Sequence, residues 1–415
     1  MFDLCLYIIT IHFLSHFYYL HNANMRIKTH KNGRPSHSNA WNASSNDIVA
    51  TIDAAAIRHN VDYLRKMSKT DIMPVLKANA YGHGAIPISK ILRSHGVKMI
   101  GTATLGEALM LRKSGDNGRI VAWLYDVNGP ELREAIRKNI DICIVDSSHV
   151  PVVCKLAAKH AQRVRIHLFV DTGINRAGIR YTESIPTALE LSNAPCIALV
   201  GLMSHFIQSE LQNDATTHKQ LRMFRELRDT LLRDHNVAFE HVHMANSGGC
   251  LNYDVSDFTL ARPGLSVFGM DPNGKCNKNL WPAMTVESLI IQIKPISKGE
   301  TVGYDKTYTA KKNMLICIAP IGYADGVPRS SSGKLHVIIN GTRRKVLGNI
   351  SMDQIVIEAH PNDAIGNTVL LFGSPRNGGA IQTIYDVADA SNTIPYEITM
   401  RVNLSMRVAM KYINV

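Results

Sequence analysis

Lys77 stands in a stretch that is otherwise apolar, IMPVLKA at residues 72–78. A lysine in such a strand is either buried or points to the open end of the fold, and burial lowers the pKa of its amine until the neutral form is accessible. A neutral amine can form a Schiff base with an aldehyde. The alternative is an ordinary lysine whose amine reaches solvent at a strand end. The sequence that follows, ANAYGHG, favours the first interpretation, because glycines and small residues let a backbone approach a ligand closely.

Two glycine-containing segments further along the chain could bind phosphate. Residues 247–249, SGG, and residues 264–266, GLS, each follow a predicted strand. Backbone N–H groups in the loops after strands seven and eight bind phosphate in many α/β barrels. Each segment alone could equally be a simple turn with a serine at a helix N-terminus. Combined with a Schiff-base lysine, they indicate pyridoxal phosphate, because the aldehyde and the phosphate are the two groups by which a protein holds that cofactor.

Other polar residues that follow predicted strands are Arg176, His205, Asn246 and Arg262. If Arg262 faces the pyridine nitrogen, its permanent positive charge discourages the ring from taking up a proton. A ring without that proton is a weaker electron sink, so a carbanion formed next to it is short-lived and transamination or elimination is suppressed. The alternative for Arg262 is a structural arginine that is paired with an acid.

The elements that must position these residues alternate between short β-branched runs and stretches with helical periodicity, such as residues 130–139 and 218–235. Eight strands over about 200 residues are typical of a (β/α)8 barrel of the TIM type, whose chemistry lies at the C-terminal ends of the strands. A doubly wound open sheet is the alternative that strand counting leaves open. The eight predicted strands are residues 72–78, 97–104, 119–125, 140–146, 164–171, 196–206, 237–246 and 258–264.

Beyond about residue 281 the helical stretches fade and short strands with Gly, Asn and Asp at their joints predominate. We therefore expect the barrel to span residues 54–275 and a mainly-β domain to span residues 276–415. The run DIVATID at residues 47–53 is expected to pair with that domain. Residues 1–46 are expected to be a disordered extension or, as far as Met25, an over-extended reading frame.

Composition excludes several classes of protein. The formal charge of +12 is spread along the chain without a basic stripe, so nucleic acid is not an expected partner. Seven cysteines without C-x-x-C spacing argue against a disulfide framework and against structural zinc, and no metal site is predicted. Residues 2–20 are apolar but interrupted by Asp3, His12 and His16, so neither a signal peptide nor a membrane span is expected. These features favour a cytoplasmic enzyme.

Several strings resemble the signature of the bacterial alanine racemases, which are fold type III pyridoxal phosphate enzymes. The strings occur in the family's order from about residue 47 to the C-terminus: VLKANAYGHG, HMANSGG, ARPGL, ETVGYDKTYT, PIGYADG and SMDQ. The resemblance implies that Lys77 bonds the cofactor and that the other cofactor-binding residues are Tyr81, Arg176, His205, Asn246, Ser247, Arg262, Gly264 and Leu265. It implies a substrate site made by Arg176, Tyr323, Met352 and Asp353.

The resemblance also implies the reaction, which is interconversion of L-alanine and D-alanine to supply D-alanine for peptidoglycan. Racemisation removes a proton from one face of Cα and delivers one to the other, so two bases suit it: Lys77 and Tyr304. A tyrosine with a pKa near ~10 needs help to act as a base. In similar enzymes the residue matching His205 contacts those matching both Tyr304 and Arg262. Because Tyr304 belongs to the β domain, the resemblance places it on the partner subunit of a homodimer with shared active sites.

One residue departs from the family's pattern. Well-known relatives carry a carbamylated lysine two residues before the aspartate of DTG, where it braces the arginine matching Arg176, whereas this chain has Phe169. We expect activity to survive, because neither proposed proton carrier changes.

Two rival functions remain open. A racemase of broader amino-acid specificity would use the same scaffold. A non-catalytic pyridoxal phosphate carrier would have a lysine-bearing barrel but lack the β domain, which residues 281–415 argue against.

Overall fold

The computed structural model describes residues 47–159, 163–373 and 382–415. The predictions for residues 1–46 lie outside this part of the chain. No helix within the described ranges is long and apolar enough to cross a membrane.

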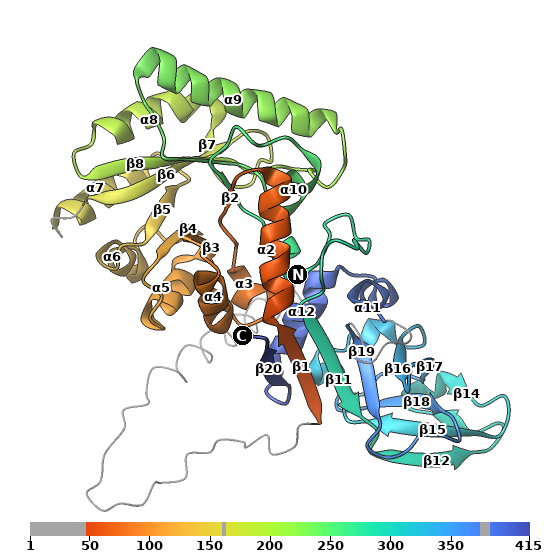
Figure 1. The fold of residues 1–415 in the computed structure, drawn as a ribbon. Helices are drawn as coiled ribbons and strands as arrows, with labels where there is room; N and C mark the ends of the chain where they lie inside the picture. The colour runs from red at the N-terminus through yellow and green to blue at the C-terminus, as the bar shows by residue number, and fades with distance from the viewer. Residues whose placement is uncertain (1–46, 160–162, 374–381) are drawn as a thin grey trace, which may run out of the picture. The chain divides into compact units, whose positions relative to one another are not determined.

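The first half of the described chain is a barrel of parallel strands (Figure 1). The strands are β2 (Asp71–Ile72), β3 (Met99–Thr104), β4 (Arg119–Leu124), β5 (Asp141–Ile144), β6 (Val164–Asp171), β8 (Ile197–Met203), β9 (His241–His243) and β10 (Leu260–Ala261), with β7 (Ile179–Arg180) beside β6. A parallel bridge between Val75 and Gly101 joins the β2 segment to β3. Backbone bonds from Thr259 to Val242 and from Arg262 to Ala245 join β10 to β9. The sheet therefore closes on itself, which excludes the doubly wound open sheet.

Several predicted strands are shorter in the structure, and two of these differences affect the residues at the strand ends. The strand predicted at residues 72–78 is regular only to Ile72, because Pro74 has no N–H to donate to a ladder. The backbone up to Leu76 still bonds to both neighbours, and a short helix, α3 (Lys77–Tyr81), begins at Lys77. The strand predicted at residues 237–246 is confined to β9, and Asn246 instead caps the following helix.

Helices connect the barrel strands, and several begin at side-chain caps. Asp53 caps α2, Thr104 and Glu107 form a capping box at α5, and Asp214 caps α9. The helices are α2 (Ala54–Ser68), α4 (Ala85–Ser94), α5 (Leu105–Lys113), α6 (Pro130–Arg137), α7 (His149–Lys159), α8 (Ser184–Asn193), α9 (Ala215–His235) and α10 (Ser247–Asn252), with short 3-10 turns at Tyr181–Glu183 and Leu265–Phe268.

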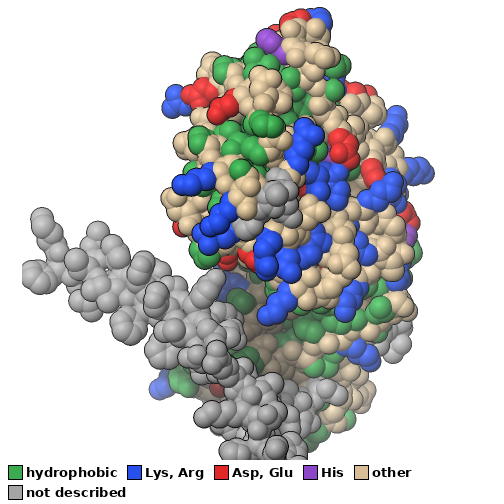
Figure 2. All heavy atoms as spheres, turned by 90° about the vertical axis from the view of Figure 1, so that its left-hand side faces the viewer, with side chains coloured by type: hydrophobic (Ala, Val, Ile, Leu, Met, Phe, Trp, Pro, Cys, Tyr) green, Lys and Arg blue, Asp and Glu red, His purple; other side chains and the backbone are tan. Residues whose placement is uncertain are grey.

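Basic side chains gather on one face of the molecule (Figure 2), the side on which Figure 1 shows α5, α6 and α7. These helices carry Lys or Arg in their last turns: Arg112, Lys113, Arg137 and Lys159. A cation at a helix C-terminus interacts favourably with the helix dipole. Part of the positive charge of the chain is therefore explained by helix ends.

The second half of the described chain is built on a nine-stranded sheet in the order β12-β15-β18-β17-β16-β19-β11-β1-β20. Its first strand in the sequence, β1 (Ile48–Asp53), precedes the barrel, pairs antiparallel with β11 and parallel with β20, and so ties both ends of the described chain to one sheet. The other strands are β11 (Met284–Leu289), β12 (Gln292–Ile296), β15 (Met314–Ala319), β16 (His336–Ile339), β17 (Thr342–Leu347), β18 (Ile355–Ala359), β19 (Thr368–Phe372) and β20 (Ala409–Ile413).

Smaller elements complete this part of the chain. A hairpin of β13 (Thr301–Val302) and β14 (Tyr308–Thr309) carries a 3-10 turn at Tyr304–Lys306, and two further 3-10 turns lie at Tyr323–Asp325 and Arg329–Ser331. Two helices, α11 (Ile384–Ser391) and α12 (Pro395–Leu404), follow the sheet strands. Residues of α12 reach the barrel, where Asn79 donates to Asn403 over 2.7 Å.

Candidate active site

A cavity of about 700 Å³ opens at the C-terminal ends of the barrel strands. It is lined by most of the residues that the sequence singled out: Lys77, Tyr81, Arg176, His205, Asn246, Ser247, Arg262, Gly264 and Leu265. Residues that the sequence did not single out also line it, among them Trp123, Glu210, Tyr396 and Met400. The structure thus brings together residues from strands far apart in the sequence, as the barrel topology requires.

The backbone after Lys77 makes an unusual left-handed turn. Four consecutive non-glycine residues, Ala78 to Tyr81, have φ between +51° and +57°. This conformation costs roughly 1–2 kcal/mol per residue, so surrounding contacts must stabilise it. The Asn79 side chain supplies two of them, since Oδ1 accepts the Ala85 N–H over 2.7 Å while the amide nitrogen bonds to α12. Lys77 is therefore presented to the cavity by a turn that is held from both sides.

The environment of Lys77 favours its neutral amine. Burial and the positive charge of Arg176 lower its pKa, and the carboxylate of Glu107 opposes them. The Lys77 nitrogen lies 5.6 Å from the centre of the Tyr81 ring. A lowered pKa makes a lysine a better nucleophile or base near neutral pH.

Arg262 is a buried cation, 3% exposed, and no described carboxylate pairs with it. Its Nη1 donates to the carbonyl and to Nδ1 of His243, over 2.6 and 2.9 Å, and its Nη2 donates to the carbonyl of Ser204 over 2.6 Å. Its Nε makes no hydrogen bond with any described residue. The sequence left open a structural arginine paired with an acid, and these contacts do not support that alternative.

His205 lies beside Arg262, with Nδ1 of the imidazole 3.4 Å from Nη2 of the guanidinium. Burial and the charges of Arg262 and Arg176 lower the pKa of His205 well below its ordinary value, so the ring is neutral. Because a guanidinium only donates, Nδ1 is the acceptor and the ring proton is assigned to Nε2. His205 therefore offers one N–H donor, and no described residue accepts from it.

The loops after β9 and β10 meet at Ser247. Its Oγ accepts the backbone N–H groups of Gly264 and Ser266 over 3.2 and 3.1 Å. Asn246 caps α10 by accepting the N–H of Gly249 over 3.0 Å. A side chain at Gly264 would collide with the hydroxyl of Tyr81, so only glycine lets the two approach. The hydroxyls of Ser247 and Tyr81 can donate to a phosphate, and the sequence predicts a phosphate site at these loops.

Phe169 is 3% exposed, lines the cavity and belongs to one apolar cluster with Met73, Met99, Val121, Cys143, Met203 and Leu260. Arg176 lines the cavity nearby but is exposed, and it has no hydrogen bond or ion pair within the described residues. The missing lysine is thus replaced by apolar packing, and no other described side chain takes over the bracing of Arg176.

Four predicted site residues lie outside the cavity lining of the chain: Tyr304, Tyr323, Met352 and Asp353. Tyr304, Tyr323 and Met352 are 70%, 41% and 52% exposed. Their segments contact one another, since Asn349 bonds to the Tyr304 carbonyl and the Tyr323 N–H bonds to Ser351. Asp353 instead forms an ion pair with Arg407 over 2.8 Å.

Sequence reasoning missed three buried polar residues behind the cavity, Asp141, His167 and His243, which are all 0% exposed. The sequence did carry a signal for them, because each is a polar residue within a predicted barrel strand, in DICI, VRIHLFVD and HVH. It also missed Glu107, whose signal was the T-x-x-E spacing of a capping box.

Two family profiles cover nearly all of the described chain. The alanine racemase N-terminal domain matches residues 52–272, and the alanine racemase C-terminal domain matches residues 283–412. Among curated proteins, an alanine racemase from Salinispora arenicola is 35% identical over 87% of this chain and 97% of its own length. One from Mycolicibacterium smegmatis is 33% identical over 84% of this chain and 90% of its own length.

Solved structures agree with these matches. The crystal structure of alanine racemase from the D-cycloserine producer Streptomyces lavendulae has a TM-score of 0.83 and 32% identity, covering 90% of this chain and 98% of its own. That of alanine racemase from Bartonella henselae, with covalently bound pyridoxal phosphate, has a TM-score of 0.78 and 28% identity, covering 88% and 99%. From these matches and from the cavity described above, we conclude that the chain belongs to the alanine racemase family.

Proposed function

We propose that this protein interconverts L-alanine and D-alanine with pyridoxal 5′-phosphate held by Lys77. The observation that carries the proposal is that one cavity is lined both by a lysine of lowered pKa and by Arg262, a buried cation that no described carboxylate neutralises. Buried charges without a partner are costly and are found at functional sites.

The residues present fit the cofactor. The amine of Lys77 would hold the aldehyde carbon, and Ser247 with the loops of Gly264 and Leu265 would hold the phosphate. The unbonded Nε of Arg262 would face the pyridine nitrogen. When bound, pyridoxal phosphate supplies an electron sink that weakens the Cα–H bond of an amino acid.

The protein's own groups then move the protons. Nζ of Lys77 takes the proton from Cα on one face, and Oη of Tyr304 delivers a proton to Cα on the opposite face, so that the configuration inverts. In the reverse direction the two groups exchange roles. Arg262 cannot give up its proton to the ring, which limits side reactions that need a long-lived carbanion.

Tyr304 would come from a second copy of the chain, so we propose a homodimer in which each site is shared. The support is that Tyr304, Tyr323 and Met352 are exposed on the β domain, whereas the cavity is open to its surroundings. The N–H on Nε2 of His205 would donate to the Tyr304 oxygen and stabilise its phenolate, which makes the tyrosine a stronger acid and a usable base near neutral pH. Arg176, Tyr323, Met352 and Asp353 are proposed to contact the substrate.

We propose a cytoplasmic enzyme that supplies D-alanine for peptidoglycan. The test is incubation of the purified protein with L-alanine, L-serine or L-lysine in deuterated water, followed by chiral analysis and mass spectrometry. The proposal expects D-alanine that carries deuterium at Cα. Equal turnover of serine or lysine would favour a racemase of broad specificity, and no exchange with any substrate would favour a non-catalytic carrier.

A further inference from the structure

A chain of hydrogen bonds runs through the interior of the barrel from Arg262 to Asp141. Nη1 of Arg262 lies 2.9 Å from Nδ1 of His243, and Nε2 of His243 lies 2.8 Å from Nδ1 of His167. Nε2 of His167 lies 3.4 Å from Oδ2 of Asp141. Arg262 follows β10 at the cavity, whereas Asp141 begins β5 at the opposite end of the barrel. We call His243, His167 and Asp141 the axial relay.

The donor and acceptor roles of these groups assign every proton in this series of hydrogen bonds to one nitrogen. A guanidinium only donates, so Nδ1 of His243 accepts and the His243 proton is assigned to Nε2. That N–H donates to Nδ1 of His167, whose own proton is therefore on Nε2 and donates to Asp141. A carboxylate only accepts, so the order cannot run the other way without placing two donors face to face. Each ring thus carries one N–H and one bare nitrogen, and burial with the charge of Arg262 lowers the pKa of His243 well below its ordinary value.

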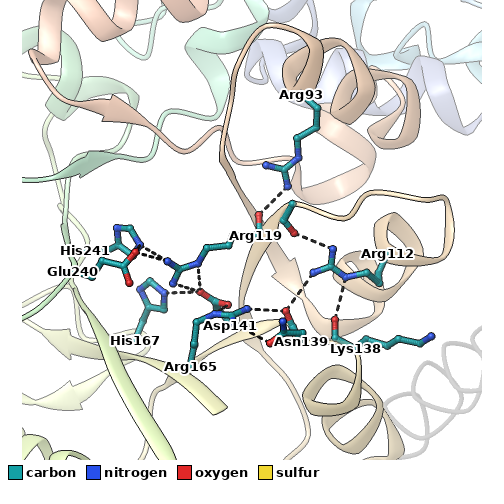
Figure 3. Close-up of polar contacts among 11 residues, drawn as sticks. Arg93, Arg112, Arg119, Lys138, Asn139, Asp141, Arg165, His167, Glu240 and His241 are labelled. Atoms are coloured by element: carbon teal, nitrogen blue, oxygen red, sulfur yellow. Dashed lines mark hydrogen bonds and ion pairs between the residues drawn. The ribbon is translucent and has the colours of Figure 1, made fainter. Parts of the chain in front are cut away.

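Asp141 is fixed at the far end by two arginines, and Figure 3 shows it between them and His167. Arg119 donates to Oδ2 from Nη2 over 2.6 Å, and Arg165 donates to Oδ1 from Nε over 2.6 Å. Burial of Asp141 opposes ionisation, but the bond from His167 and the charges of Arg119 and Arg165 outweigh it and lower its pKa. Arg119 also bonds to Glu240 over 2.7 Å. The carboxylate therefore stays ionised and immobile.

The cavity end has no such anchor of its own. Arg262 has only carbonyls and imidazole nitrogens as partners among the described residues, and a carbonyl accepts from several directions. The Nδ1 lone pair of His243 is directional, and it is available only while the His243 proton stays on Nε2. The orientation of the Arg262 guanidinium thus depends on which way the protons of the axial relay point.

We propose that Asp141 is a positioning residue that, through His167 and His243, fixes the orientation of the Arg262 guanidinium toward the pyridine ring and so restrains side reactions of the bound cofactor. The catalytic meaning of this inference rests on the proposed function. The proton order of the axial relay does not rest on the proposed function, because it follows from the hydrogen bonds among the protein's own residues.

Asp141→Asn is the sharpest variant. It keeps the size of the side chain, but its amide can donate as well as accept, so the reversed proton order becomes accessible. The reversed order puts a hydrogen on Nδ1 of His243 opposite the Nη1 donor of Arg262, which pushes the guanidinium away.

Two further variants complete the design. Asp116→Asn is the matched control, because Asp116 is also a buried aspartate, 8% exposed and paired with Arg93 over 3.0 Å, but it has no contact with the relay. His243→Asn cuts the relay at its other end, since an asparagine can accept from Arg262 but is too short to reach His167. His243→Asn tests the positioning role of the axial relay if Asp141→Asn does not fold.

Two readouts are taken on the cofactor-loaded, full-length protein. The first is histidine ¹⁵N NMR. The wild type is expected to show His243 and His167 with an unprotonated Nδ1. The signals that disappear in His243→Asn are those of His243. Asp141→Asn is expected to show protonated Nδ1 in part of the molecules. A wild-type His243 that is protonated on Nδ1 overturns the proposal, whether or not the protein racemises alanine.

The second readout is the fraction of turnovers that transfer the amino group of alanine to the cofactor and release pyruvate. We expect this fraction to rise about tenfold in Asp141→Asn and His243→Asn, the size of effect common for groups that orient a ligand-binding side chain. Asp116→Asn is expected to match the wild type. Equal fractions in all four proteins would overturn the positioning role, and a wild type without any racemisation would instead contradict the proposed function.

Discussion

Ala78 donates its backbone N–H to Oε1 of Glu107 over 2.7 Å, which ties the left-handed turn after Lys77 to the first turn of α5. The other oxygen of the same carboxylate accepts the N–H groups of Ala103 and Thr104 over 2.9 and 3.1 Å. One carboxylate therefore caps a helix, holds a strained turn and raises the pKa of Lys77 against the effect of burial.

Glu107→Gln is expected to affect both stability and the state of Lys77. The amide nitrogen of glutamine cannot accept from Ala103 or Thr104, so we expect a loss of about 1–2 kcal/mol in the free energy of unfolding. Removal of the negative charge lowers the Lys77 pKa further, so cofactor capture by the cofactor-free protein should stay fast to lower pH. Denaturant titration and stopped-flow absorbance between pH 6 and pH 10 measure the two effects. An unchanged pH dependence would show that Glu107 does not influence Lys77.

Lys77→Ala removes the amine that we propose to hold the cofactor. The purified variant should lose the visible absorbance that a lysine-bound pyridoxal phosphate gives, and racemisation should fall below detection. Lys77→Arg, which keeps the positive charge but is a poor nucleophile, is the matched control and should behave in the same way. Retained visible absorbance in either variant would refute the covalent role of Lys77.

Phe169→Lys tests the departure from the family's pattern. We expect the wild-type protein to be active, because Lys77 and Tyr304 are both present and Phe169 packs within the barrel wall. The variant places a long cationic side chain within an apolar cluster, so it should lower the melting temperature and should not raise the turnover number. An inactive wild type whose Phe169→Lys variant gains racemisation would overturn this prediction.

His83 predicts a specific pH dependence of stability. Burial lowers its pKa from 6.5 to about 4, despite the two backbone carbonyls that contact Nδ1. In the unfolded chain the His83 imidazole binds a proton below pH 6.5, whereas in the folded chain it binds one only below about pH 4. Stability is therefore highest above pH 6.5 and is lost as the pH falls toward 4, by about 1.4 kcal/mol per pH unit for this one group.

The measurement compares urea unfolding of the wild type and His83→Gln at a fixed protein concentration and at several pH values in this window. The variant should be less stable at pH 7 and should show a shallower acid slope. Equal slopes for the two proteins would contradict the assignment of a buried neutral His83.

The sequence predicted the barrel because its strands are short β-branched runs between helices, and that pattern needs no knowledge of distant contacts. It predicted the residues around the cavity because they follow strands, and the barrel topology gathers the ends of strands at one rim. The predicted secondary structure was wrong at Lys77, because the predicted strand at residues 72–78 includes this residue, whereas the structure has a short helix that begins there. The left-handed turn there depends on Glu107 and Asn403, which lie 29 and 324 residues from their partners in the sequence.

The axial relay was missed for a related reason. A histidine inside an apolar strand does not reveal its partners, and His167 and His243 are 76 residues apart. Only closure of the barrel places them 2.8 Å from each other. The family's pattern likewise could not show what surrounds Phe169, because the apolar cluster that contains it is assembled from six other positions that are far apart in the sequence.

The central claim, that each site combines Lys77 of one subunit with Tyr304 of the other, is tested most directly by mixing two inactive variants. Tyr304→Phe should bind the cofactor normally but lose conversion in both directions, because each direction needs the phenol oxygen to move a proton on one face of Cα. Lys77→Ala keeps Tyr304. A hybrid dimer of the two chains has one site with both groups and one with neither.

The two purified variants are mixed in equal amounts under conditions that exchange subunits, and racemisation is measured in both directions. Random exchange makes half of the dimers hybrid, so we predict recovery of about a quarter of the wild-type activity, in both directions, at the rate of subunit exchange. A mixture that stays as inactive as its two components, although exchange is shown by mass spectrometry, would contradict the shared site.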